Sequence, residues 1–136
     1  MINILIVDDM PEFKVYNTIN YLKSQKLDFK YEICKSCSSG LKYLHTHRNE
    51  IDLLILDLGL PFYDSGSDYS PLEGLVFIEE VHRLNLQIPT IVNSTTSIPN
   101  EADYEKHFKE NNNIFVHVPV LEGDWLYEFI QNNLNK

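Results

Sequence analysis

Three aspartates that directly follow short apolar runs are the residues of this chain best suited to chemistry. Asp8 and Asp9 come after the run Ile4–Val7, and Asp57 comes after the run Leu53–Leu56. Carboxylates that lie close together repel one another unless a cation is present. Mg²⁺ suits such a place because it takes oxygen ligands and pairs with phosphoryl oxygens. An aspartate can also attack phosphorus as a nucleophile and become an aspartyl phosphate. The spacing therefore predicts magnesium-dependent phosphoryl chemistry if one pocket holds all three side chains.

A purely structural role is the alternative for each aspartate taken alone. An aspartate at the end of a strand most often caps a helix or forms a turn, and Asp9 by itself fits an N-cap. Carboxylates after two different strands argue for function instead. The reason is that ligands of an open α/β sheet bind beyond the carboxyl ends of its strands. We therefore interpret Asp8, Asp9 and Asp57 as one site.

The elements that must position these aspartates alternate between strand and helix. Most of the apolar runs lack polar alternation, which is typical of strands buried on both faces of a parallel sheet. The predicted strands are Ile4–Val7, Tyr31–Cys34, Leu53–Leu56, Thr90–Val92 and Ile114–Val118. Apolar residues at helical spacing follow each of them. The order predicts an α/β fold, a single (βα)5 domain over residues 1–136 with a doubly wound parallel sheet. In the flavodoxin-like strand order 2-1-3-4-5, the first and third strands are neighbours, which would bring the three aspartates together.

Two stretches carry the signature of a helix start. Asp9–Glu12 and Ser70–Glu73 each have a cap residue, an early proline and a glutamate three residues after the cap. This is a capping-box pattern, and it predicts Pro71 at the first helical position. Between the third strand and Ser70 lies an acidic and aromatic loop, residues 58–70, which is longer than the roughly 2–6 residues usual for such a connection. We expect this loop to lie beside the aspartates.

Composition excludes several classes of partner. The chain has 20 acidic and 11 basic residues, with a formal net charge of −9. This charge repels the phosphate backbone of nucleic acids and anionic membrane surfaces, so we expect neither as a partner. No apolar run approaches the roughly 18 residues of a membrane-spanning helix, and we expect a cytoplasmic protein. Phosphate-binding P-loop, dinucleotide-binding and serine-hydrolase motifs are also absent from the sequence.

Taken together, these segments resemble the receiver domain of response regulators in two-component (phosphorelay) signalling. The resemblance extends from Ile4 to about Leu134. Its matching segments are ILIVDD at the first strand, LLILDLGLP around Asp57, the Glu73–Leu75 helix start, IPTIVNST at the fourth strand and Pro119 after the fifth strand.

The resemblance implies a role for individual residues. Asp57 would be the phospho-acceptor, and Mg²⁺ would be bound by Asp57, Asp9, Asp8 and the backbone carbonyl of Gly59. Ser94 would donate a hydrogen bond to the phosphoryl group, with Thr95 beside it, and Phe115 stands at the position of the aromatic switch residue. The implied partners are a sensor histidine kinase or phosphotransfer protein and a downstream protein. The implied activity is that of a signalling module and not of an enzyme.

The chain departs from the family pattern at three points. The lysine that the family has at the end of the fifth strand falls at Val118, Thr95 replaces a small residue, and the loop after Asp57 is extended. The departure at Val118 keeps a second interpretation open, a pseudo-receiver that binds partners without phosphorylation. A small metal-dependent phosphatase that uses the same pocket is the third interpretation.

A pair of cysteines offers a different chemistry. Cys34 and Cys37 have the C-x-x-C spacing of redox pairs, and His45 and His47 lie close in sequence. However, Cys34 belongs to an apolar strand, and residues i and i+2 of a helix do not face each other. We therefore expect two reduced thiols and no zinc site.

Overall fold

A computed structural model describes residues 1–64 and 68–134 of the chain. Its sheet has five parallel strands in the order β2-β1-β3-β4-β5, as predicted. The strands are β1 Ile2–Val7, β2 Phe29–Cys34, β3 Leu53–Leu56, β4 Thr90–Asn93 and β5 Phe115–Val118. The helices are α1 Val15–Ser24, α2 Cys37–His47, α3 Gly74–Arg83, α4 Glu101–Glu110 and α5 Gly123–Asn133. The fold class and strand order are therefore confirmed.

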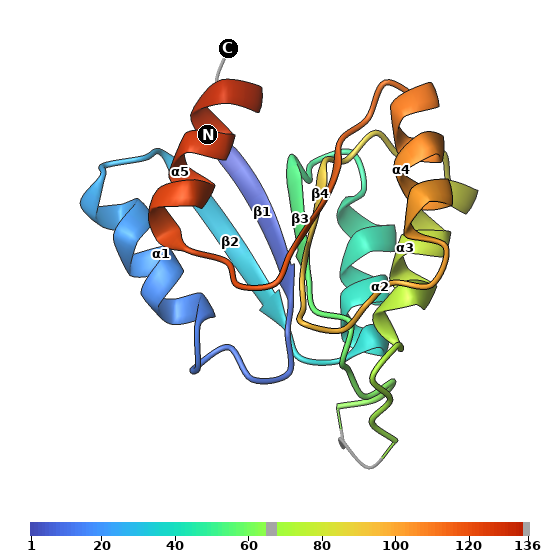
Figure 1. Cartoon of the computed structure of the whole chain (residues 1–136). Coiled ribbons are helices and arrows are strands. Elements are labelled where there is room, and N and C mark those ends of the chain that lie inside the picture. The colour runs from blue at the N-terminus through green and yellow to red at the C-terminus, as the bar shows by residue number, and fades with distance from the viewer. Residues whose placement is uncertain (65–67, 135–136) are drawn as a thin grey trace.

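The helices cover both faces of the sheet, with α1 and α5 on one face and α2, α3 and α4 on the other (Figure 1). Alternation along the strands divides the apolar side chains between these two layers. In β1, Ile4 and Ile6 pack toward α1 and α5, whereas Leu5 and Val7 pack toward the other three helices. The central strands are therefore buried on both sides, which explains their continuous apolar runs. In the described part of the chain, no helix is both long enough and apolar enough to cross a membrane.

The two predicted capping boxes are wrong. Helix α1 begins at Val15 and α3 at Gly74, and neither has a side-chain cap. Residues 11–14 and 71–73 form turns instead. At the second stretch, Ser70 exchanges two backbone hydrogen bonds of 3.1 Å with Leu60, which holds it away from the helix axis. A capping box does exist at α2, where Ser36 and Ser39 bond to each other's backbone N–H groups. The sequence pattern missed it because serine replaces the usual glutamate at the third helical position.

The described part of the long loop is docked against α2. The backbone carbonyls of Pro61 and Phe62 accept hydrogen bonds from the N–H groups of Cys37 and Ser38, at 2.9 and 2.7 Å. The Ser36 hydroxyl donates to Asp64 at 2.5 Å. Because the first N–H groups of a helix have no partner within the helix, the loop supplies acceptors that the fold needs. Residues 65–67 of this loop lie outside the described residues.

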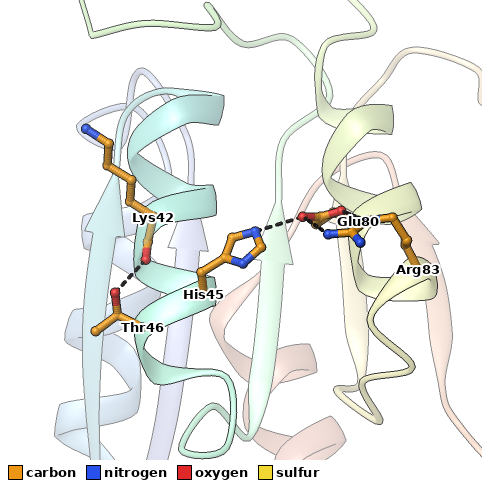
Figure 2. A network of polar contacts seen from close by, with 5 residues as sticks. All are labelled: Lys42, His45, Thr46, Glu80 and Arg83. Carbon is orange, nitrogen blue, oxygen red and sulfur yellow. Dashed lines mark hydrogen bonds and ion pairs between the residues drawn. The ribbon is translucent and has the colours of Figure 1, made fainter.

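Helices α2 and α3 are also joined by a polar contact at their surface (Figure 2). His45 of α2 lies 2.7 Å from Glu80 of α3, and Glu80 also accepts two hydrogen bonds from Arg83. The hydrogen bonds from Arg83, followed by the contact with His45, lower the pKa of Glu80 to about 2. These contacts therefore favour the ionised form of Glu80, which joins the two helices through His45.

Helix α3 begins so close to the end of β3 that only glycine fits at its first residue. A Cβ atom at Gly74 would lie 2.6 Å from the carbonyl oxygen of Asp57 and 2.8 Å from the Cα atom of Leu58. The N–H of Gly74 donates to the carbonyl of Leu58 at 2.9 Å, which locks this approach. The glycine thus determines where the backbone after Asp57 lies.

We expect Gly74→Ala to lower the free energy of unfolding by about 1–3 kcal/mol, because backbone atoms must move to admit the methyl group. Urea denaturation of the variant and wild type measures this change. Val76→Ala, at an exposed position of the same helix, is the control and should change stability by less than about 0.5 kcal/mol. Equal stability of Gly74→Ala and wild type would contradict the tight approach.

Candidate functional site

The three aspartates meet at the carboxyl ends of β1 and β3. These strands are neighbours, with Val7 paired to Leu56 in the parallel register. The backbone N–H of Asp57 donates to the carbonyl of Val7 at 2.9 Å, and that of Asp8 donates to Cys34 at 3.0 Å. The hydrogen bonding of the sheet therefore continues into the site. Each aspartate offers one carboxylate oxygen, and these oxygens all lie within 4.8 Å of one another.

The site raises the pKa of its carboxylic acids. Burial raises the pKa of Asp57 to about 6, and the charges of Asp8 and Asp9 act in the same direction. Burial is also the main reason why the pKa values of Asp8 and Asp9 are raised. The N–H of Met10 donates to Asp8 at 2.8 Å and that of Gly59 donates to Asp57 at 3.2 Å, and each bond partly offsets the burial. The folded protein thus holds three carboxylates whose joint ionisation is unfavourable without a cation.

The carboxylates lie in an open pocket of about 620 Å³. It is lined by Asp8, Asp9, Met10, Phe13, Lys14, Asp57, Gly59, Tyr69, Asn93, Ser94, Thr95, Thr96 and Pro119. Asp8, Asp9, Asp57, Gly59, Ser94 and Thr95 were predicted from the sequence, and the fold brings all of these together. Phe115 is not among the lining residues.

The end of β4 places a hydroxyl group beside the carboxylates. Ser94 is buried, and its Oγ accepts a hydrogen bond from the N–H of Thr96 at 3.1 Å. Because a hydroxyl both accepts and donates, the proton of Ser94 remains available to another acceptor. Thr95 is exposed at the rim of the pocket, whereas Asn93 is buried and accepts from the N–H of Leu121 at 3.1 Å. The strand end thus offers the hydroxyl of Ser94 to the pocket as a hydrogen-bond donor.

Gly59 lies under the aromatic ring of Tyr69, which the end of the long loop places at the pocket. Its hypothetical Cβ atom would collide with the hydroxyl group of Tyr69, so the phenol rests directly over this glycine. The bridge between Leu60 and Ser70 closes the loop and brings Tyr69 there. We expected the whole loop beside the aspartates, but Asp64 instead bonds to Ser36 at the start of α2. Tyr69 is the described residue of the loop beyond Gly59 that lines the pocket.

The side chains of strand β5 point to one or the other face of the sheet, toward α1 and α5 or toward α4. Val118 packs with the apolar cluster of α1 and α5 and does not line the pocket. His117 faces α4, where its Nδ1 lies 2.6 Å from Glu101 and its Nε2 donates to the carbonyl of Ser94 at 2.8 Å. Phe115 also faces α4 and packs against Tyr104 and Phe108. No side chain of β5 therefore brings a positive charge into the pocket.

Sequence reasoning missed four side chains that line the pocket, three from the segment before α1 and one from the long loop. They are Met10, Phe13, Lys14 and Tyr69. Residues 10–14 were read as part of a capped helix, so their side chains were assigned to a helix surface. Tyr69 is separated from Gly59 by ten positions, and only the Leu60–Ser70 bridge, which no short motif predicts, joins them.

The alternative chemistry of the cysteines has no support in the geometry. Cys34 and Cys37 are both buried free thiols, and burial is the main cause that raises the pKa of each to about 11. A thiol that stays protonated is a poor nucleophile and a poor metal ligand. His45 contacts Glu80 and His47 stacks on Tyr43. Within residues 1–64 and 68–134, the three aspartates are the one group of such side chains close enough to share a metal ion.

Comparison with solved structures identifies the fold. No protein-family model matches the chain, and no curated protein matches it in sequence. A CheY-like receiver domain protein of Methanospirillum hungatei matches with a TM-score of 0.66 and 20% identity, over 97% of this chain and 93% of that one. The chemotaxis response regulator CheY4 of Vibrio cholerae has a TM-score of 0.65 and 17% identity, over 97% and 98%.

A third match is the Mn²⁺-bound form of response regulator Rcp1, with a TM-score of 0.64 and 22% identity, over 97% of this chain and 91% of that one. These matches cover both partners almost completely. The chain therefore has the fold of response-regulator receiver domains, and its three aspartates lie at the topological switch point of that fold.

The burial of the carboxylates, together with their mutual repulsion, predicts a pH-dependent cost to stability in divalent-free buffer. The folded-state pKa of Asp57, about 6, lies above the ordinary value of 3.8, so its contribution to stability falls as the pH rises through 6. We expect the free energy of unfolding of Asp57→Asn to be about 1–2 kcal/mol higher than that of the wild type at pH 7.5, because the variant buries no charge at this position. This range allows for solvent screening. The difference should vanish near pH 4. Chemical denaturation at both pH values measures it.

Glu105→Gln, at an exposed position of α4, is the control for net charge and should not show this pH dependence. An Asp57→Asn variant no more stable than wild type at pH 7.5 would contradict the raised pKa.

Proposed function

We propose that this chain is a response-regulator receiver that accepts a phosphoryl group on Asp57 with Mg²⁺ and then changes a protein-interaction face. The observation that carries the proposal is the set of three carboxylate oxygens within 4.8 Å at the switch point of a receiver fold. A sensor histidine kinase or a phosphotransfer protein would be the donor, and a downstream protein would read the switched face. The protein would act as a cytoplasmic signalling module and not as an enzyme.

The donor set fits a hard divalent cation. Asp8, Asp9, Asp57 and the backbone carbonyl of Gly59 offer only oxygen, which Mg²⁺ prefers. The pocket is open enough for the waters that Mg²⁺ retains, and the raised pKa of Asp57 shows charge that a cation would compensate. That one structural neighbour is described in its Mn²⁺-bound form supports a divalent ion on this fold. When bound, the ion would supply positive charge against the negative charge that develops on the transferred phosphoryl group.

The side chains of the pocket divide the remaining work. A carboxylate oxygen of Asp57 attacks phosphorus while the bond to the donor's leaving group breaks, and the leaving group takes the electron pair. The free O–H of Ser94 donates a hydrogen bond to a phosphoryl oxygen. Met10, Phe13 and Tyr69 form the exposed rim of the pocket, where a phosphoryl donor would approach. Phosphorylation would thus depend on residues from β1, β3 and β4.

The route from the site to the surface runs through Ser94. Its carbonyl accepts from His117, which also contacts Glu101 at the first turn of α4. Phe115 packs against Tyr104 and Phe108 on the same helix. A shift of Ser94 toward a phosphoryl group would therefore act on the α4–β5 side of the molecule. We propose the α4, β5 and α5 surface as the face that switches.

A pseudo-receiver is the second candidate, and Val118 is the observation that favours it. The side chain is apolar, partly buried and packed against the core, so β5 would bring no cation to the phosphoryl group. In that case the protein would bind its partner through a face that Asp57 does not control. Asp57→Asn would then leave partner binding unchanged.

Acetyl phosphate and Mg²⁺ test the proposal directly. We expect intact-mass analysis to show the gain of one phosphoryl group on the wild type and none on Asp57→Asn, since only Asp57 is placed as the nucleophile. Mg²⁺ should also raise the thermal midpoint of the wild type, because it binds the folded site alone. Beryllofluoride with Mg²⁺ should raise it further.

Asp52→Asn is the matched control, because Asp52 lies exposed before β3 at the opposite end of the same strand. It should gain the phosphoryl group as the wild type does. A wild type that shows neither a mass gain nor stabilisation by Mg²⁺ would rule out the phosphorylated receiver and leave the pseudo-receiver. Steady turnover of a generic aryl phosphate would instead indicate a phosphatase.

A further inference from the structure

We propose that Lys14 supplies the positive charge toward the phosphoryl group that β5 does not supply. This inference rests on the proposed function and adds a positioning residue to it. Lys14 is the one cationic side chain among the described residues that line the pocket. It enters from the segment before α1, on the side of Asp8 and Asp9, and not from β5.

The backbone holds Lys14 firmly at the edge of the pocket. Lys14 is the residue directly before α1, and its carbonyl accepts hydrogen bonds from both the N–H and the hydroxyl of Thr18, each at 3.1 Å. Thr18 is buried, and the next residue, Val15, is part of the apolar core. The N–H of Tyr16 donates to the carbonyl of Pro11 at 3.1 Å, which closes the turn that precedes the helix. The backbone of Lys14 is therefore held in place, whereas its ammonium group can move.

The ammonium group has no other partner in the part of the chain that the structure describes. Its side chain is exposed, and within residues 1–64 and 68–134 it makes neither a hydrogen bond nor an ion pair. A lysine places a compact charge at the end of a flexible four-carbon stem, so it can turn toward a new anion. In the unphosphorylated site its charge already acts on Asp8, whose pKa it lowers against the larger effect of burial.

The charges of the reaction explain why such a cation is needed. With acetyl phosphate, an oxygen of Asp57 forms a bond to phosphorus, the bond from phosphorus to the acetate oxygen breaks, and acetate leaves with the electron pair. The phosphoryl group keeps two negative charges beside Asp8 and Asp9, where Asp57 alone carried one. Negative charge in the pocket therefore increases by one. A divalent ion held by the same carboxylates would offset part of this charge. Lys14, the cationic side chain among the described residues that line the pocket, would offset more of it.

Removal of the Lys14 charge should lower the rate of phosphoryl uptake and raise the affinity for Mg²⁺. Lys14→Gln should slow phosphoryl uptake from acetyl phosphate by about 5- to 20-fold, because the transferred group loses a favourable charge. The same variant should bind Mg²⁺ alone about two- to fivefold more tightly, because a cation that repels Mg²⁺ is gone. Lys14→Arg keeps the charge and should stay within about threefold of the wild type in both measurements. High salt should narrow both differences.

Lys23→Gln also removes one lysine charge, but from the last turn of α1. There the ammonium group of Lys23 lies 5.6 Å from the ring centre of Tyr31. This variant is the matched control and should behave as the wild type. Mass spectrometry gives the uptake rate, and titration calorimetry with MgCl₂ gives the affinity. A merely structural role for Lys14 would weaken uptake and Mg²⁺ binding together, and that result would overturn the proposal.

The experiment separates this inference from the proposed function. If the wild type gains a phosphoryl group on Asp57 and Lys14→Gln gains it equally fast, the inference fails and the proposed function stands. If the wild type gains none, the proposed function fails and this inference fails with it. Slower uptake together with tighter Mg²⁺ binding in Lys14→Gln, rescued by Lys14→Arg, would support it.

Discussion

The repulsion among three carboxylates held at one edge of the sheet is the constraint on which this structure depends. The hydrogen bond from Asp57 to the carbonyl of Val7 extends the β1–β3 pairing to the site, so the aspartates cannot separate without disrupting the central strands. Those strands are buried on both faces, and apolar burial of this kind is the main source of stability in a small domain. The apolar core thus holds the three carboxylates together in an unfavourable arrangement that a cation would relieve. Relief of this cost would contribute to the free energy of cation binding.

The sequence predicted the parts of this arrangement that follow from periodicity. Short apolar runs, most of them without polar alternation, identified all five strands, and their alternation with helices predicted a parallel sheet. The flavodoxin-like strand order, which places Asp8, Asp9 and Asp57 together, is the order that the structure shows. The helix starts were wrong because local capping patterns compete with tertiary contacts. At α3, the bridge of Ser70 to Leu60 and the close approach of Gly74 decided the outcome. The rim of the pocket was missed for the same reason, since Lys14 and Tyr69 reach it through turns and a bridge without a sequence signature.

The long loop has a structural task that its composition does not suggest. Its acidic and aromatic residues indicated a loop that lies beside the site, yet its carbonyls accept hydrogen bonds from the first N–H groups of α2 and its Asp64 accepts one from Ser36. Helix α2 in turn is linked to α3 through His45 and Glu80. The loop therefore joins the backbone after Asp57 to the layer of helices opposite α1 and α5.

The hydrogen bonds around His117 offer a path by which a site without a lysine on β5 would be coupled to the surface. The lysine of the family pattern falls at position 118, where this chain has the partly buried Val118 packed against the apolar core. His117 points the other way and joins the carbonyl of Ser94 to the carboxylate of Glu101, so the end of β4 and the start of α4 share one side chain. In the proposed receiver, charge compensation and signal transmission would be carried by different residues. Compensation would come from Lys14 on the α1 side of the pocket, and transmission would pass through Ser94, whose carbonyl is bonded to His117.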